Sequence, residues 1–122
     1  MKSDDVNRMI DEMTTNRSHE WVDDGGYPTE EFLDTIEKWD VLKGENNALM
    51  KFIKPYWRYS SAGFWSEKEH EGYGTEYRIS TGGWSGNEDI IEALKNNRLF
   101  WNLYWVQSRR GGDYIFEVKD KE

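Results

Sequence analysis

The segment from Thr75 to Val118 constrains the fold most, because strand, helix and turn signals follow one another along it without a break. Residues 75–81 (TEYRIST) have the β-branched and aromatic composition of a strand. Ser85 and Glu88 then predict a capping box, in which the hydroxyl accepts from a first-turn amide and the carboxylate accepts from the amide of the cap residue. A helix is therefore expected to begin near Gly86.

The rest of this segment predicts two further strands. Residues 99–106 (LFWNLYWV) are apolar on both faces, which favours a strand that is covered on both sides. An Arg-Arg-Gly-Gly turn over 109–112 leads to a last strand over 114–118, which is expected to pair back as a hairpin. Because a helix links 75–81 to 99–106, we expect these two strands to run parallel in a right-handed crossover.

This topology places two loops at the same edge of the sheet, where we expect an anion-binding site. The open amides of a helix N-terminus and two guanidinium groups together hold phosphate well, and a tryptophan adds a wall for a planar ligand such as a nucleotide. The candidate ligand-binding residues are Gly82, Gly83, Trp84, Ser85, Gly86, Asn87, Arg109 and Arg110. The alternative is that the glycines serve only the turns and the arginines are solvated, since GGWSG is neither a P-loop nor a dinucleotide fingerprint.

Helical spacing of apolar residues predicts helices in the first part of the chain. We expect one helix within 3–13, a second over 30–43, and a third that begins near Asn46 and ends before Pro55. Residues 56–67 are rich in aromatic side chains and predict an extended strand that pairs with the strand over 75–81 across a polar turn.

Together these elements predict one α+β domain over 1–122, with an acidic helical part (1–45) and a sheet-forming part (56–118). The sheet is expected to be mixed and about four-stranded, with the chain order β-β-α-β-β and two or three N-terminal helices packed on it. Aromatic residues make up 16% of the chain, with seven tryptophans, although the mean hydropathy is only −0.98. The core is therefore expected to be built largely from ring packing.

The formal net charge of −8 comes entirely from the first part of the chain. Residues 1–45 hold thirteen acidic and five basic side chains, whereas residues 46–122 hold eleven of each. An acidic balance argues against nucleic acid as a partner, because such binding rests largely on neutralisation of phosphates by Lys and Arg. Two interpretations stay open for the acidic part: a solvated surface, or an imitation of the charge of DNA that occupies a basic groove on another protein.

No pattern of residues predicts catalysis, a bound metal or a cofactor. His19 and His70 lie in polar segments without the spacing of a zinc-binding helix, and Ser85 does not lie in a nucleophile elbow. The chain has no cysteine, which fits a reducing compartment, and we recognise no signal peptide or spanning apolar run. We therefore expect a cytoplasmic protein that has no membrane partner; nothing in the sequence specifies its oligomeric state.

Three stretches carry a resemblance to a known group of proteins: YPTEEFLDTIEKWD, STGGWSGNEDIIEAL and LFWNLYWVQSRRGGDYIFEV. They resemble segments of small uncharacterised proteins encoded by bacteriophages. The resemblance covers most of the chain after about Tyr27. It implies no catalytic residue or fold, but it implies a cytosolic accessory protein, for which interference with the machinery of a bacterial host is a common role.

Three functions are consistent with these observations. The first is a non-enzymatic protein that binds and modulates a host protein through its acidic helical part or an exposed aromatic patch. The second is a protein that binds or sequesters a nucleotide or phosphate at the 82–87 loop and the 109–112 turn. The third is an enzyme with an unrecognised active site. We favour them in that order, with little to separate the first two.

Overall fold

The computed structural model describes residues 21–72 and 74–120. Over these residues the chain is α+β, as the sequence predicts. The helices are α3 (Glu30–Glu37), α4 (Asn46–Ile53), α5 (Ser85–Asn96) and α6 (Arg98–Tyr104), and the strands are β1 (Trp65–His70), β2 (Gly74–Ser80), β3 (Trp105–Arg109) and β4 (Asp113–Val118). The helix predicted within 3–13 lies outside the described residues. None of the described helices is long and apolar enough to cross a membrane.

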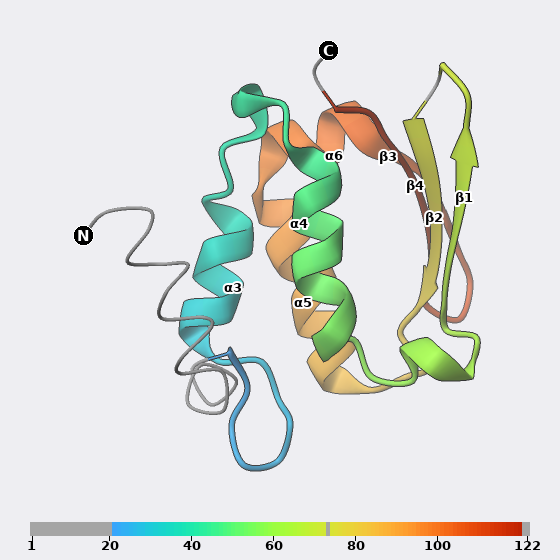
Figure 1. Ribbon diagram of the computed structural model, residues 1–122. Coiled ribbons are helices and arrows are strands. Elements are labelled where there is room, and N and C mark those ends of the chain that lie inside the picture. The colour runs from blue at the N-terminus through green and yellow to red at the C-terminus, as the bar shows by residue number, and fades with distance from the viewer. Residues whose placement is uncertain (1–20, 73, 121–122) are drawn as a thin grey trace.

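The four strands form one sheet in the order β1-β2-β4-β3 (Figure 1). All three neighbouring pairs are antiparallel, so the sheet is not mixed as expected. Strands β2 and β3 are both antiparallel to β4, and therefore run in the same direction on either side of it. The expected parallel orientation of these two strands is thus present, but they do not pair. The last strand of the chain inserts between them.

The helices lie on one face of the sheet, with α4 and α5 between the sheet and α3 (Figure 1). No other element of the described chain covers the opposite face of the sheet (Figure 1). Antiparallel sheets commonly have one covered and one open face, and side chains along each strand point alternately to the two. Buried side chains from the helices and the sheet form a single cluster. Its largest fully buried aromatic side chains are Phe32, Trp57, Tyr77, Phe100 and Phe116. Rings are therefore prominent in the core, as predicted, although aliphatic side chains outnumber them.

Residues 99–104 form the helix α6 instead of the first part of a strand, and this prediction was wrong. The side chain of Asn97 caps α6 by accepting a hydrogen bond from the amide of Phe100 at 3.2 Å. Phe100 is fully buried and Tyr104, one turn later, is half-buried, whereas Leu103 is exposed. The apolar residues therefore divide between two faces at helical spacing, and only residues from Trp105 onward are extended.

The strand predicted over 56–67 is also displaced. Tyr59 and Gly63 adopt left-handed conformations with φ of 68° and 95°, so the chain turns twice before β1 begins. The indole of Trp57 is buried and donates a hydrogen bond to the carbonyl of Ser80 at 3.0 Å, which fixes this irregular segment against the end of β2. The first strand therefore extends into the stretch that was predicted to be a polar turn.

The predicted capping box at the start of α5 is absent. The helix begins at Ser85 itself, and the residue at its N-cap position, Trp84, makes no side-chain capping hydrogen bond. A serine inside the first turn cannot act as the cap. The cap residue precedes the helix, and its side chain accepts a hydrogen bond from an amide two or three residues further along the chain. By contrast, Thr29 caps α3, because its hydroxyl accepts a hydrogen bond from the amide of Phe32 at 3.2 Å.

This difference gives a direct test of the helix starts. Thr29→Ala is expected to lower the free energy of unfolding by about 1 kcal/mol, because an amide of the first turn loses its partner. Ser85→Ala is expected to change it by less than about 0.5 kcal/mol. Chemical denaturation of both variants measures the two values, and equal losses would contradict the described start of α5.

Candidate functional site

The structure brings the two loops of the predicted anion site to the same edge of the sheet. The amide of Thr81, directly after β2, donates a hydrogen bond to the carbonyl of Gly112 at 3.0 Å. Gly112 has a positive φ of 85° and lies so close to the Thr81 side chain that a Cβ atom there would collide with the hydroxyl. Glycine at 112 is therefore required for this close approach.

Asn87, one of the predicted ligand-binding residues, is committed to the fold. It is fully buried, its amide nitrogen donates to the carbonyls of Arg58 at 3.1 Å and Thr81 at 3.3 Å, and its oxygen accepts from the amide of Arg58 at 3.0 Å. One carboxamide thus satisfies three backbone groups on two distant segments. This residue joins the segment after α4 to the loop before α5, and it does not face a ligand.

Trp84 folds over the start of α5 as expected, but its cationic neighbour is Arg58. The guanidinium carbon of Arg58 lies 4.1 Å from the centre of the Trp84 ring, and the ring of Tyr27 lies 4.8 Å from the same indole. The bulk of the indole covers Gly86, where any added Cβ would collide with it. No local pattern indicates Arg58 as this neighbour, because it lies 26 residues before Trp84 in the sequence.

Arg109 and Arg110 lie exposed at the hairpin turn between β3 and β4. Arg109 contributes to a cavity of about 230 Å³ on the open face of the sheet, where Arg78 and Asp113 also lie. Neither Trp84 nor any residue of 82–87 lines this cavity. The predicted residues therefore share one edge but do not converge on one volume, and anion binding by the 82–87 loop stays a prediction.

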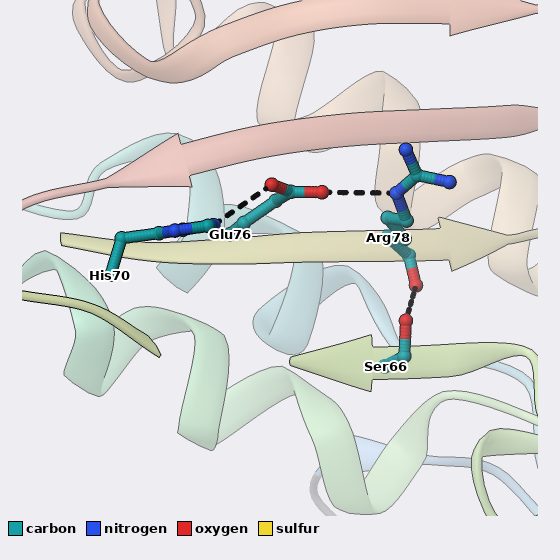
Figure 2. Close-up of polar contacts among 4 residues, drawn as sticks. All are labelled: Ser66, His70, Glu76 and Arg78. Atoms are coloured by element: carbon teal, nitrogen blue, oxygen red, sulfur yellow. Dashed lines mark hydrogen bonds and ion pairs between the residues drawn. The ribbon is translucent and has the colours of Figure 1, made fainter. Parts of the chain in front are cut away.

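A chain of polar contacts runs along the open face of the sheet (Figure 2). Glu76 holds His70 through one carboxylate oxygen, with Nε2 and Oε1 3.1 Å apart, and Arg78 through the other, with Nε and Oε2 3.0 Å apart. The hydrogen bond from Arg78, together with that from His70, keeps the pKa of Glu76 below its ordinary 4.5. Two partners on opposite sides therefore fix this carboxylate.

This chain of contacts does not form a nucleophile and base. The hydroxyl of Ser66 donates to the backbone carbonyl of Arg78 at 3.5 Å, and Ser66 lies four residues from His70 along β1. A catalytic serine must instead lie within hydrogen-bonding distance of its base. Nor does any group of three His, Asp or Glu side chains among the described residues suit a metal ion.

A third group of polar contacts links the start of α4 to the sheet and to the end of the described chain. The hydroxyl of Tyr77 donates to Oδ1 of Asn47 at 2.6 Å, and Oδ1 of Asp120 accepts from the amide of Asn47 at 2.8 Å. Burial raises the pKa of Tyr77 well above its ordinary value of 10.0, with the carboxylates of Glu67 and Asp120 adding to the effect. Tyr77 is therefore held as a neutral hydrogen-bond donor, and these contacts join α4 to the sheet.

Residues 21–45, here called the acidic segment, carry a strong excess of negative charge. It holds eight acidic and two basic side chains, and the exposed acids are Asp23, Asp24, Glu30, Glu31, Asp34, Asp40 and Glu45. The ion pairs formed between described residues involve none of these carboxylates. These carboxylates therefore form no direct ion pair with another described side chain, and the segment keeps an excess of six negative charges.

The acidic segment also contains a groove and an exposed apolar side chain. The groove has a volume of about 530 Å³ and is lined by three carboxylates, two lysines and the half-buried ring of Trp39; the charged residues are Asp34, Asp40, Glu45, Lys38 and Lys43. Leu42 lies in the same segment with 76% of its surface exposed, more than any other large hydrophobic residue of the described chain. A second apolar surface lies on α6 and the start of β3, where Leu99, Leu103, Trp105 and Val106 are exposed.

Comparison with known proteins adds no assignment. No known protein family matches the sequence, and no curated protein or solved structure is detectably similar to it. The resemblance to small bacteriophage proteins therefore stays a prediction.

The contacts of Glu76 make a prediction about its titration. Arg78→Ala is expected to raise the pKa of Glu76 towards 4.5, because the hydrogen bond from Arg78 is the main cause of its lowering. His70→Ala is expected to raise it by a smaller amount. Lys54→Ala, which removes a cation paired with Glu67, serves as the control. Carboxyl NMR titration measures the three midpoints.

The same shift predicts how stability depends on pH. A carboxyl group with a lowered pKa in the folded state stabilises the fold above its ordinary pKa, and this contribution is lost as the pH falls through the folded-state value. The wild-type protein is therefore expected to lose more stability than Glu76→Gln when the pH is lowered below 4.5. Equal acid-induced losses would show that the contacts of Glu76 do not persist in solution.

Proposed function

We propose that the protein is a small accessory protein of the kind that bacteriophages encode, and that it binds a basic surface of a host protein without catalysing a reaction. The observation that carries this proposal is the acidic segment. Seven of its eight carboxylates are exposed and form no ion pair with other described side chains, whereas residues 46–122 are balanced in charge. Complementary charge accelerates association and selects the partner.

The groove and Leu42 supply the apolar contacts that charge alone does not provide. Interfaces commonly derive most of their binding energy from a few aromatic or aliphatic side chains surrounded by polar groups. Trp39 is held in place because its indole donates to the carbonyl of Glu45 at 3.3 Å. The acidic segment thus combines an aromatic wall, an exposed leucine and surrounding carboxylates.

Local hydrogen bonds preorganise this surface. Oδ1 of Asp40 accepts from the amide of Leu42 at 3.2 Å, and Gly44 ends the same turn in a left-handed conformation with φ of 81°. The turn that presents Leu42 is therefore formed before a partner binds. Side chains on an ordered backbone lose less conformational entropy on binding than those on a disordered one.

The chemistry of the partner follows from this surface. A partner that carries clustered Lys and Arg, such as the groove of a nucleic-acid-binding protein, presents the complementary charge. Carboxylates on such a surface then occupy positions that phosphates of DNA otherwise take. This mode of action requires a host cytoplasm but no cofactor and no bound metal.

A pair of matched variants tests the proposal. Glu30→Gln/Glu31→Gln/Asp34→Asn removes three charges from the acidic segment, and Glu88→Gln/Asp89→Asn/Glu92→Gln removes three from the start of α5. Affinity capture from bacterial lysate, followed by mass spectrometry, is expected to recover a basic protein with the wild type and the α5 variant but not with the α3 variant. Raised salt is expected to release it, because exposed charges are screened.

A third variant separates the acidic segment from the apolar surface on α6. Leu99→Ser/Leu103→Ser removes exposed apolar side chains without changing the charge. Loss of the captured protein in this variant, together with its retention by the α3 variant, would contradict the proposal and assign binding to α6. Capture that is insensitive to all three variants would also contradict it.

A further inference from the structure

The cavity on the open sheet face joins side chains from three strands. Arg78 lies on β2, Asp113 at the start of β4 and Arg109 at the end of β3, and all three line the cavity. The register places them on the same face. Arg78 is opposite Ile115, Ile115 is opposite Gln107, and Arg109 follows Gln107 by two residues. Alternation along a strand then directs Arg109 to the same side as Gln107.

The two guanidinium groups approach the cavity from either side of β4. Their Cα atoms are separated by two strand spacings and two residues, which corresponds to roughly 12 Å. This span is short enough for two long side chains to contact one small ligand between them. Ile115, only 8% exposed, lies opposite Arg78 and provides an apolar wall.

Both arginines have donors available for such a ligand. Arg78 uses Nε to bind Glu76, and its two terminal nitrogens project away from that carboxylate (Figure 2). Arg109 forms no ion pair with any described side chain. Guanidinium groups bind tetrahedral oxyanions through paired hydrogen bonds, and the contact with Glu76 holds Arg78 in place before a ligand arrives.

Asp113 determines which oxyanion fits. A carboxylate beside two guanidinium groups repels an anion that carries no proton, such as sulfate. A phosphate group near neutral pH retains a proton on part of its population, because its second pKa is about 6. Its P–OH group can donate to Asp113 while its other oxygens accept from the arginines.

We propose that Arg78, Arg109 and Asp113 form a binding site for a protonated phosphate group, either inorganic phosphate or a phosphate monoester. The site is separate from the acidic segment, and it does not depend on the function proposed for that segment. It also differs from the site predicted from the sequence, because Arg110 and the 82–87 loop do not line it.

Titration of the full chain with inorganic phosphate, O-phosphoserine and sulfate tests this site. Isothermal calorimetry and NMR of the arginine Nε–H groups are expected to show binding of one or both phosphates at Arg78 and Arg109, with sulfate bound about tenfold or more weakly. Binding of O-phosphoserine alone would identify a monoester as the ligand. Equal binding of sulfate and phosphate, or no binding of either phosphate, would overturn the proposal.

Neighbouring residues in the same turn provide matched variants. Arg109→Ala is expected to weaken phosphate binding by about tenfold or more, because one of two charged partners is lost. Arg110→Ala, an equally exposed arginine outside the cavity, is expected to leave it unchanged. Asp113→Asn is expected to abolish the preference for phosphate over sulfate. Equal losses in the two arginine variants would show diffuse attraction and overturn the proposal, provided that thermal unfolding confirms that both fold.

Discussion

The architecture depends on buried asparagine side chains that bind the backbone of distant segments. Asn97 donates to the carbonyls of Ile36 and Trp39, at 3.0 and 3.2 Å, while its oxygen caps α6. Asn87 joins the segment after α4 to the loop before α5 in the same way. A carboxamide is both donor and acceptor, so one side chain can satisfy several backbone groups that would be costly to bury unpaired. These bonds fix where helices begin and end in a core otherwise made of aromatic and aliphatic side chains.

The cap at Asn97 explains why part of the sheet was predicted correctly and part was not. Strand β2, helix α5 and the final hairpin each carry a local signal, and the structure contains all three. The stretch after Asn97 reads as a strand because it is apolar throughout, a pattern that short buried helices share. The spacing of Phe100 and Tyr104 was the available sign of a helix. The capping bond depends on the position of α3, which the sequence does not reveal.

For the candidate sites, too, the features with a local signal could be predicted and those that depend on distant segments could not. The shared edge of the 82–87 loop and the 109–112 turn followed from chain direction alone, and the bond between Thr81 and Gly112 confirms it. The side chains that lie beside the predicted residues could not be predicted in this way. Arg58 lies on Trp84 because Asn87 joins the segment after α4 to the loop before α5. Arg109 lines a cavity with Arg78 because β4 inserts between β2 and β3. Strand order is set by the whole sheet, so no local pattern encodes these pairs.

The fold also separates the carboxylates of α3 from the proposed phosphate site. Helix α3, which carries Glu30, Glu31 and Asp34, lies on the far side of α4 and α5 from the sheet (Figure 1), whereas Arg78 and Arg109 lie on the sheet face that no described helix covers. A helix is about 10 Å across, so the layer of α4 and α5 together with α3 itself places these carboxylates roughly 20 Å from the sheet. The Debye length is about 8 Å at physiological salt, which screens exposed charges over this distance. An anion can therefore approach the sheet face of this acidic protein against little repulsion from the carboxylates of α3.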